Sequence, residues 1–346
     1  MVETTTIKDI ARKLNISNVT VSRALRGLQY VSPALKEKIF KTAEELNYLP
    51  NVLAIGLRTK KTKVISLIVP YFRNPVFIDF LMYIERLASK DNISVIFCVT
   101  DEDITIEEKH IQMLDMGLVD GAILVPCIRK SSSNEYIHRT RKKNIVLFNR
   151  KIEGFNFDIV QFDQQKAVYM AMEYLYMLGY RRIAAISGDL NTSVAKERFS
   201  GYRKALHNFG LVEKKALIKH GAVTKENGYK STLQLLNTNH PPEVIFTLNN
   251  IFTIGSLKAI KEKNKKIPED IAFISMDDIY SSELIEPKIT YVKQDTYQMA
   301  NRAYEILSDR INQKAINEVQ QHKEEYFQAE LVIRDSCGYH LKNQKK

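Results

Sequence analysis

The segment TIKDIARKLNISNVTVSRALRGLQYVSPALKEKIFKTAEELNYLP, residues 6–50, predicts three short helices with a sharp turn between the first two. Apolar side chains recur three or four positions apart, which is the period of a helix with one buried face. They are Ile7, Ile10, Ala11, Leu14, Val21, Ala24, Leu25, Leu35, Ile39, Ala43 and Leu46. Thr6 is expected to cap the first helix, with Asp9 completing a capping box. Ser17 and Ser32 are the expected caps of the other two, and Gly27 ends the second.

The outward face of the second predicted helix carries Asn18, Val19, Ser22 and Arg23. In a helix-turn-helix, the N-terminal residues of the second helix reach base edges in the major groove of DNA. Arginine can donate two hydrogen bonds to guanine, asparagine can pair with adenine, and valine can contact a thymine methyl group. This face therefore predicts a DNA-reading helix. The alternative is a small helical bundle with a solvated polar face.

The positive charge of the chain is concentrated near its beginning. The 346 residues carry a net charge of +11, with 51 Lys and Arg against 40 Asp and Glu. Residues 1–63 hold 12 of these bases and 5 of these acids, a net of +7, and the other 283 residues carry +4. Clustered positive charge suits phosphate binding. A basic but merely solvated surface would not explain the clustering.

Composition excludes several classes of protein. With 45% hydrophobic and 26% charged residues, a chain of this length is expected to form two or three globular domains. Its three cysteines, Cys98, Cys127 and Cys337, are far apart and are expected to be reduced thiols. We find no signal-peptide pattern and no apolar run of membrane-spanning length. We therefore expect a cytoplasmic protein, held at the nucleoid through DNA, without a membrane partner.

A junction follows the third predicted helix. Residues 51–57, NVLAIGL, could form two helical turns, and four basic residues follow between positions 58 and 63. So short a helix is marginal alone, and Gly56 costs it about 1 kcal/mol relative to alanine. We expect this junction to stay loose until a partner orders it. A plain flexible linker is the alternative.

From Val64 onward, short apolar runs alternate with longer amphipathic stretches, which predicts parallel sheets covered by helices on both faces. The expected strands are Val64–Val69, Ile93–Val99, Gly121–Val125, Ile145–Phe148, Ile183–Ile186, Val244–Phe246 and Ala272–Ile274. The expected helices are Phe77–Ala88, Ile106–Met116, Gln165–Leu178, Val194–Phe209, Tyr229–Leu236, Thr253–Lys263 and Gln298–Ile311. These strands are too many for one compact sheet. A break near Asp158–Asp163 indicates two similar α/β lobes with a ligand cleft between them.

Polar side chains lie where ligands of parallel sheets bind, at the carboxyl ends of strands. Asn149, Asn249 and Asp277 each follow a predicted strand closely, and Arg198 lies in the helix after another. An arginine, a carboxylate and amides at one cleft can hydrogen-bond the hydroxyls or acid group of a small polar metabolite. Helix capping is the alternative role for such side chains.

The sequence offers no catalytic or metal-binding constellation. Asp277 and Asp278 are adjacent, but adjacent side chains on a loop usually diverge. Glu107 and His110 share one helical spacing, whereas a di-metal bundle needs two such copies, so this pair is expected on a solvated face. Zinc spacings, phosphate-binding glycine loops and Gly-x-Ser-x-Gly elbows are absent. We therefore expect no enzymatic activity and no cofactor.

Over nearly its whole length, the chain resembles transcription regulators of the lactose-repressor (LacI/GalR) family. The motifs that carry the resemblance include TIKDIA from Thr6, VSRAL from Val21, NYLPN from Asn47, LGYRRI from Leu178, PED from Pro268, DD from Asp277 and LVIRDSC from Leu331. The resemblance implies an N-terminal all-α helix-turn-helix domain followed by an α/β core. That core would be two-lobed and like a periplasmic binding protein, with parallel sheets.

The resemblance also implies domain boundaries. A helix-turn-helix domain would span residues 1–50, a hinge helix 51–62, an effector-binding and dimerisation domain 63–340, and a basic tail 341–346. The first lobe would comprise about 63–161 and 292–324, and the second about 162–291 and 325–340. Three crossovers would join the lobes.

Asn18, Val19 and Arg23 match the base-reading residues of the family. Ala54 and Leu57 match its hinge helix, where a leucine from each subunit wedges into the minor groove and kinks the operator. The other residues expected to contact DNA are Thr6, Ser17, Thr20, Ser22, Arg26, Tyr30, Ser32 and Asn51. Hinge helices of this kind fold on DNA.

The residues that match the effector pocket of the family are Phe77, Asn149, Arg198, Val223, Asn249, Asp277 and Gln294. Three departures leave the identity of the ligand open. Asn250 replaces the aspartate of the usual Asn-Asp pair, and Asn149 stands where an aspartate is common. Val223 stands where some sugar-binding relatives place a stacking tryptophan, and the chain has no tryptophan at all.

The sequence therefore predicts a homodimeric repressor that binds a pseudo-palindromic operator. A small-molecule effector, expected to be a sugar or sugar derivative, would control its affinity for DNA. The tail after Cys337 lacks leucine heptads, so a tetramer-forming helix is not expected. The alternative is a carbohydrate-binding protein or enzyme without a role on DNA, which would need an export signal or a catalytic set.

Overall fold

The computed structural model describes residues 5–25, 31–48, 61–72, 74–128, 135–140, 143–280, 282–312 and 322–343. The chain forms two compact units, residues 1–62 and residues 63–346. Residues 26–30 and 49–60, which hold the predicted helix-ending glycine and most of the predicted hinge, lie outside the described residues. Within the described part of the chain, no helix is both long enough and apolar enough to cross a membrane.

The first unit consists of three helices around a small apolar core, as predicted. They are α1 (Ile7–Leu14), α2 (Asn18–Leu25) and α3 (Pro33–Glu45). The buried core residues are Ile10, Ala11, Val21, Ala24, Val31, Ile39 and Ala43. Every apolar residue selected by helical spacing is buried or half-buried in this cluster. The period of the sequence was therefore sufficient to identify the packed faces.

Polar side chains fix the starts of α1 and α2. The Asp9 carboxylate accepts hydrogen bonds from the backbone N–H of Thr6 at 2.9 Å and from its hydroxyl at 2.7 Å. The Ser17 hydroxyl accepts from the backbone N–H of Thr20 at 3.1 Å. Ser32 precedes α3, but its side chain makes no capping hydrogen bond, which differs from the prediction. A proline begins that helix instead, with its φ already fixed near the helical value.

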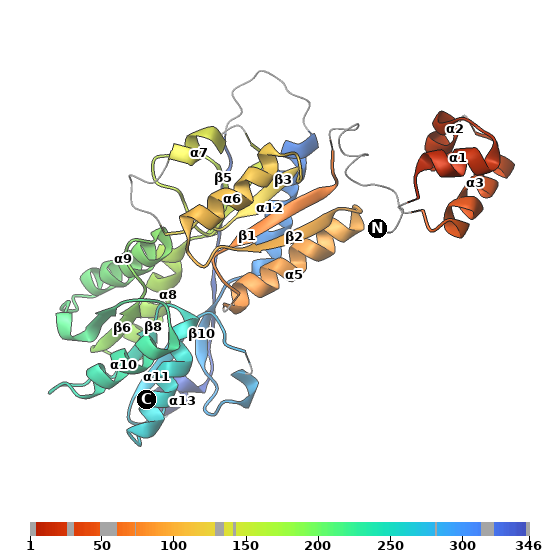
Figure 1. Cartoon of the computed structure of the whole chain (residues 1–346). Coiled ribbons are helices and arrows are strands. Elements are labelled where there is room, and N and C mark those ends of the chain that lie inside the picture. Colours follow the sequence, from red (N-terminus) through yellow and green to blue (C-terminus); the bar gives the residue numbers. More distant parts are fainter. Residues whose placement is uncertain are drawn as a thin grey trace. The chain divides into compact units, whose positions relative to one another are not determined.

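The second unit contains two six-stranded sheets, one in each lobe (Figure 1). The first sheet has the order β11-β5-β4-β3-β1-β2, formed by β11 (Glu324–Phe327), β5 (Asp158–Phe162), β4 (Ile145–Phe148), β3 (Gly121–Leu124), β1 (Val64–Val69) and β2 (Ser94–Val99). The second has the order β12-β10-β9-β8-β6-β7, formed by β12 (Glu330–Val332), β10 (Thr290–Lys293), β9 (Ala272–Met276), β8 (Val244–Thr247), β6 (Ile183–Ser187) and β7 (Ile218–His220). All neighbouring strands run parallel except β10 and β12.

Helices cover both faces of each sheet. The first lobe has α5 (Pro75–Lys90), α6 (Ile104–Asp115), α7 (Glu135–Thr140) and α12 (Thr296–Asn312). The second has α8 (Gln164–Met177), α9 (Ser193–Asn208), α10 (Lys225–Leu236), α11 (Asn250–Glu262) and α13 (Tyr339–Asn343). Within β1, Ile65 and Leu67 pack in the same cluster as α5 and α12, whereas Ile68 packs with Ile111 of α6. The predicted fold class, parallel sheets buried on both faces, is confirmed.

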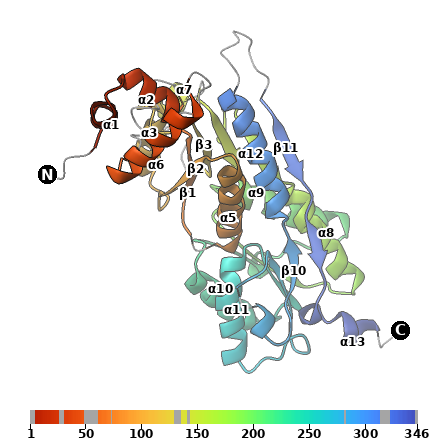
Figure 2. The ribbon, with the colours of Figure 1, turned by 90° about the vertical axis from the view of Figure 1, so that its right-hand side faces the viewer.

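The chain passes between the lobes three times. It enters the second lobe from β5 to α8, returns from β10 to α12, and crosses again from β11 to β12. Figure 2 shows the returning helix α12 next to α5 in the first lobe. The expectation of a break near residues 158–163 needs correction, because Asp158–Phe162 forms the buried strand β5 and the chain leaves the lobe directly after it.

Four further strands escaped the sequence analysis. They are β7, β10, β11 and β12, which are short and include polar or charged residues. Three of them lie at sheet edges, where one side of the strand faces no neighbour. A continuous apolar run is therefore not required of them, and the pattern used to find buried strands does not apply.

Helices α8 and α9 approach each other closely at Gly201. A Cβ atom at this position would lie 2.3 Å from the backbone oxygen of Gln165, which is closer than real contacts allow. Only glycine therefore permits this distance between the two helices. Because α8 begins at Gln164 and α9 carries Arg198, this contact also sets the distance between those two residues.

We expect Gly201→Ala to destabilise the second unit by about 1–3 kcal/mol, although alanine is the better helix former by about 1 kcal/mol. The added methyl group must push α9 away from α8. Urea unfolding followed by circular dichroism measures the effect, with Lys204→Ala on the exposed side of α9 as the control. Equal unfolding midpoints for Gly201→Ala and the unsubstituted protein would contradict the proposed close contact.

Candidate functional site

The outward face of α2 is exposed in the first unit. Val19 is 57% exposed, and Asn18 and Arg23 are exposed beside it. Val21 and Ala24, on the opposite side of the helix, are fully buried. Val19 thus offers a methyl-contacting group next to two hydrogen-bonding side chains.

Hydroxyl groups surround this face. The Ser17 and Thr20 hydroxyls lie 2.8 Å apart at the start of α2, and Ser22 on the same helix is half-buried. Thr6 and Ser32 precede α1 and α3. Hydroxyls and free N–H groups at helix N-termini are typical phosphate contacts in protein–DNA complexes. The other predicted DNA-binding residues, Arg26, Tyr30, Asn51, Ala54 and Leu57, lie outside the described residues.

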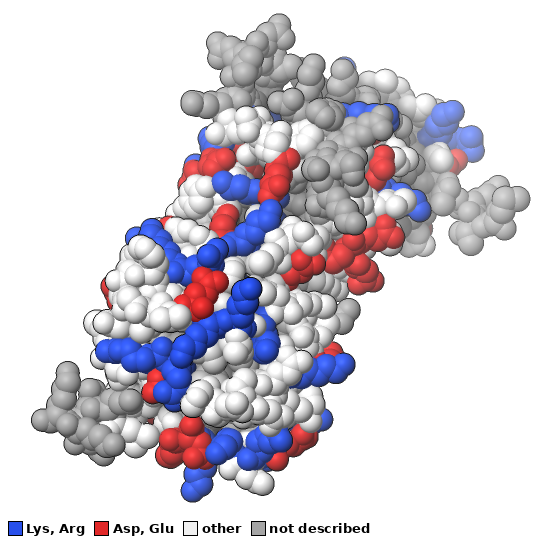
Figure 3. Space-filling model, turned by 90° about the vertical axis from the view of Figure 1, so that its left-hand side faces the viewer, with Lys and Arg blue, Asp and Glu red and all other residues white. Residues whose placement is uncertain are grey.

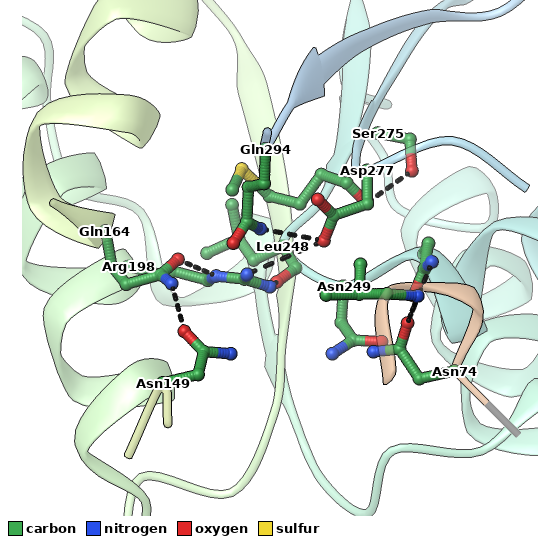
Figure 4. Close-up of polar contacts among 12 residues, drawn as sticks. Asn74, Asn149, Gln164, Arg198, Leu248, Asn249, Ser275, Asp277 and Gln294 are labelled. Atoms are coloured by element: carbon green, nitrogen blue, oxygen red, sulfur yellow. Dashed lines mark hydrogen bonds and ion pairs between the residues drawn. The ribbon is translucent and has the colours of Figure 1, made fainter. Parts of the chain in front are cut away.

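A cavity of about 300 Å³ lies in the second unit, lined by residues of both lobes. All seven residues predicted for the effector pocket line it, namely Phe77, Asn149, Arg198, Val223, Asn249, Asp277 and Gln294. Figure 4 shows how the polar members of this set converge. They come from the loops after β4, β8, β9 and β10 and from α9, so the strand-end rule placed Asn149, Asn249 and Asp277 together correctly, whereas Gln294 was expected only from the family resemblance.

Arg198 is the most constrained side chain of the cavity, with only 4% of it exposed. Its Nε donates to Gln164 Oε1 at 2.7 Å, and its Nη1 donates to the backbone oxygen of Leu248 at 2.7 Å (Figure 4). Its Nη2 lies 3.7 Å from Asp277 Oδ2. Burial lowers the pKa of this guanidinium, but arginine is not deprotonated in proteins, so the positive charge stays.

Asp277 follows β9 with a left-handed φ of 61°. Burial raises the pKa of its carboxyl to about 6, against the opposing effects of Arg198 and of a hydrogen bond from Gln294. Gln294 Nε2 donates to Asp277 Oδ2 at 2.9 Å, so one carboxylate oxygen serves both neighbours. Within the described residues the other oxygen, Oδ1, accepts no hydrogen bond and is available to a ligand.

Gln164, which the sequence did not single out, connects the two lobes. It is 1% exposed and begins α8. Its Oε1 accepts from Arg198, and its Nε2 donates to Asn149 Oδ1 in the first lobe at 2.8 Å. The strand before it, β5, was the one taken for a break. The strand-end rule therefore could not reach Gln164.

The asparagines of the cavity cap helices as well. Asn249 Oδ1 accepts from the backbone N–H of Ile251 at the start of α11, and Asn74 Oδ1 accepts from that of Val76 at the start of α5, both at 3.0 Å. Asn250 Nδ2 donates to Asn74 Oδ1 at 3.3 Å and so links the lobes. The capping alternative is therefore correct for these oxygens, while the Asn249 amide nitrogen remains beside the cavity.

A second ion pair lines the cavity from the first lobe. Arg150 Nη1 donates to Glu102 Oε1 at 3.0 Å and to the backbone oxygen of Pro126 at 2.9 Å. Glu102 Oε2 accepts from the backbone N–H of Ile128 at 2.8 Å. The sequence analysis missed this pair. Arg150 directly follows Asn149 after β4, while Glu102 follows β2 and Ile128 follows β3, so applying the strand-end rule to β2 and β3 as well would have found the pair.

The remaining walls of the cavity are apolar. Phe77 lies with its ring centroid 5.8 Å from that of Tyr71 and packs on the core at Phe148. Val223 lines the cavity from the second lobe, where an aromatic ring would offer a stacking surface. The cavity thus combines aromatic and aliphatic surface with a few placed polar groups, as small-molecule sites do.

Glu107 corrects one expectation. It is fully buried, not solvated, because its carboxylate accepts hydrogen bonds from the Cys127 backbone N–H and the Tyr136 hydroxyl. Asp277 and Asp278 diverge as expected, since Asp278 lies 3.7 Å from Arg334 and away from the cavity pair. Among the described residues, no group of three or more His, Cys, Asp or Glu could hold a metal ion.

Two family models match the chain. Residues 6–51 match the model described as bacterial regulatory proteins of the lacI family. Residues 172–337 match the model of a periplasmic binding protein-like domain. The first match covers the three-helix unit, and the second covers most of the second lobe with the return through the first.

Relatives match over nearly the full length. The HTH-type transcriptional repressor PurR of Pasteurella multocida is 28% identical over 338 residues, which covers 97% of this chain and 99% of the relative. The repressor of the same name from Haemophilus influenzae strain Rd is 29% identical over 332 residues, with 96% and 98% covered.

Solved structures share the fold. The Lac repressor dimer bound to operator and the anti-inducer ONPF has a TM-score of 0.85 at 20% identity, covering 97% of this chain and 99% of that one. A complex of the transcriptional regulator CelR with cellobiose has a TM-score of 0.72 at 24% identity, with 96% and 99% covered. The three-helix unit matches the LacI family of bacterial regulatory proteins and the core matches periplasmic binding protein-like domains, while the relatives that match over nearly the full length are transcriptional repressors.

Proposed function

We propose that this protein is a cytoplasmic, homodimeric repressor whose affinity for a pseudo-palindromic operator is set by a small polar ligand in the cavity. Two observations carry this proposal together. The Arg198–Asp277 pair is buried in the cavity that both lobes line, and the outward face of α2 is exposed in the first unit. The relatives bear the name of transcriptional repressors, which supports the sense of the regulation.

The α2 face supports direct readout of DNA. Asn18, Val19 and Arg23 offer an amide, a methyl-contacting group and a bidentate donor on one exposed surface. In a dimer, two such helices would enter successive major grooves about 34–36 Å apart. The hinge residues Ala54 and Leu57 would add the minor-groove contact at the centre of the operator.

The first lobe supports dimerisation by an exposed apolar surface. On the edge strand β2, Ile96 is 38% exposed and Phe97 is 45% exposed. Met82 on α5, the helix before this strand, and Leu118, in the segment after α6, are exposed as well. Apolar side chains in such number at one edge of a sheet mark a protein interface more often than a free surface.

The cavity supports a hydroxyl-rich ligand, such as a sugar or sugar derivative. Asp277 Oδ1 can accept and the Arg198 guanidinium can donate, and the amide nitrogens of Asn149 and Asn249 can donate too. A hydroxyl group both donates and accepts, so adjacent hydroxyls can join an arginine to a carboxylate. Phe77 offers the apolar face that the C–H side of a sugar ring needs.

Selection of bound DNA from a random pool, with and without a panel of sugars and nucleobases, tests the proposal as a whole. We expect one salt-sensitive, symmetric motif and one ligand class that changes its recovery. Binding without sequence preference would overturn the operator role. A motif whose recovery responds to no ligand would overturn the effector role of the cavity.

We expect Arg23→Ala to lose about 1–3 kcal/mol of binding free energy at a single base pair of the selected motif, because one bidentate contact disappears. Arg12→Ala is the matched control, because this substitution removes the same charge from α1, where the Arg12 side chain is 81% exposed. Its effect should be small and uniform across sequences. Fluorescence anisotropy with single-base variants measures both, and an equal loss for Arg23→Ala on all sequences would contradict its base-reading role.

We expect Phe97→Glu to convert the dimer to a monomer, because a buried, unpaired carboxylate at the β2 edge would replace apolar contact. Val212→Glu is the control, since Val212 is 73% exposed in the other lobe and should leave the dimer intact. Sedimentation velocity measures the association state. A Phe97→Glu protein that remains dimeric would rule out this edge as the interface.

We expect ligand affinity to fall as pH drops from 7 to 5. The raised pKa of Asp277, about 6, means that its carboxylate is charged above that pH and loses its acceptor character below it. If only the ionised form binds, affinity should fall about ten-fold per pH unit below the pKa. Isothermal titration with the tightest sugar of the panel measures this effect. In Asp277→Asn the dependence should vanish, and its persistence there would assign the titration to another group.

A further inference from the structure

We infer that the cavity is built for an uncharged ligand and rejects the phosphorylated or carboxylated forms of the same molecule. The inference deepens the proposed function and rests on the cavity being the effector site. Three observations support it. Both arginines of the cavity already have protein partners, two carboxylates of the cavity form no ion pair with a described residue, and side chains cap the four helices that begin at the cavity.

Both guanidinium groups that line the cavity already donate to protein acceptors and lie near a protein carboxylate. Arg198 donates to Gln164 and to the Leu248 backbone and faces Asp277 at 3.7 Å. Arg150 donates through Nη1 to Glu102. An anionic ligand would have to compete with these carboxylates for the same positive charges. A ligand hydroxyl faces no such competition, because it can donate to the carboxylate and accept from the guanidinium at once.

Two further carboxylates line the cavity, one from each lobe. Asp101 follows β2 and Asp189 follows β6. No Lys, Arg or His of the described residues forms an ion pair with either of them. Asp101 is held in a left-handed conformation (φ 49°), and Asp189 Oδ1 accepts from the backbone N–H of Asn191 at 2.9 Å. The Asp189 carboxylate is therefore held at the cavity by this hydrogen bond, and Asp101 contributes an exposed carboxylate to the lining.

Counted over the described lining, the cavity holds four carboxylates and two guanidinium groups. The carboxylates are Asp101, Glu102, Asp189 and Asp277, and the guanidinium groups belong to Arg150 and Arg198. The balance of −2 is opposite in sign to the net charge of +11 of the whole chain. Figure 3 shows a band of Lys and Arg side chains across one face of the molecule. The exterior would attract anions, so discrimination against them must come from the cavity.

Four helices begin at the cavity, an arrangement that alone would favour an anion. In each, however, a side-chain oxygen accepts a hydrogen bond from a first-turn backbone N–H. Asn74 does so for α5, Thr192 for α9, Thr224 for α10 and Asn249 for α11. One first-turn N–H of each helix is therefore satisfied within the protein. The caps thus reduce the number of N–H groups that these helix starts can offer to a phosphate.

Matched pairs of probes test the inference on the full-length dimer. The pairs are D-glucose and glucose 6-phosphate, D-ribose and ribose 5-phosphate, and adenosine and its 5′-monophosphate, with inorganic phosphate alone as a further probe. Titration calorimetry at low salt should show the neutral member of any bound pair binding at least about ten-fold more tightly. It should show no heat from inorganic phosphate. A phosphate ester that binds as tightly as its neutral partner, or more tightly, would overturn the inference.

Removing the two unpaired carboxylates should reduce the preference of the cavity for the neutral probe over its phosphate ester. In Asp101→Asn/Asp189→Asn, we expect the ratio of the two affinities to shift toward the ester by about five-fold or more, and the shift to shrink as salt is added. Glu85→Gln/Glu173→Gln is the matched control, because these two exposed carboxylates lie one in each lobe, on α5 and α8. An unchanged ratio in the aspartate variant would overturn the role assigned to these residues.

The outcomes separate this inference from the proposed function. If no probe binds and none changes operator affinity, the proposed effector site fails, and the inference fails with it. If a neutral probe binds but the charge variant and its control behave alike, only the inference fails. Operator binding by each variant, measured in parallel, establishes that the protein is folded.

Discussion

The burial of one positive charge, that of Arg198, organises the second unit. A guanidinium taken out of water costs several kcal/mol unless acceptors surround it. The acceptors come from three separate places, the start of α8, the end of β8 and the loop after β9. The close contact of α8 and α9 at Gly201 sets the distance between the two helices, and so allows Arg198 of α9 to reach Gln164 of α8. The polar side of the cavity therefore depends on the packing of the second lobe.

The sequence was most informative where local chemistry decides the structure. The helical period located every buried core residue of the first unit except Val31, and the apolar runs located seven of the strands. The rule that ligands bind at strand ends gathered Asn149, Asn249 and Asp277 correctly. Gln164 was missed because it follows β5, a strand that was not predicted, and the Arg150–Glu102 pair was missed because the rule was not applied to β2 and β3. Glu107 was misjudged, because its burial depends on partners far along the chain.

The three-helix unit and the cavity belong to separate compact parts of one chain. A ligand can alter DNA binding only if it favours one arrangement of the protein over another, and DNA must then alter ligand affinity by the same factor. The two lobes touch directly through amides, Gln164 to Asn149 and Asn250 to Asn74. Amide hydrogen bonds can be exchanged for water at little net cost. The relative position of the lobes is thus adjustable without loss of their separate cores.

Strand β1 connects the first unit to the lobe that lines one side of the cavity. The chain leaves the first unit at Thr62 and enters β1 two residues later, and the same strand ends shortly before Tyr71 and Asn74 of the cavity. Six residues of strand span roughly 20 Å. Because β1 is buried between α5 and α6 and pairs with β3 on one side and β2 on the other, it cannot shift alone and must move with the first lobe as one body. The chain that leaves the first unit therefore runs directly into a strand that is fixed within the first lobe, so the start of this strand at Val64 must move whenever that lobe moves.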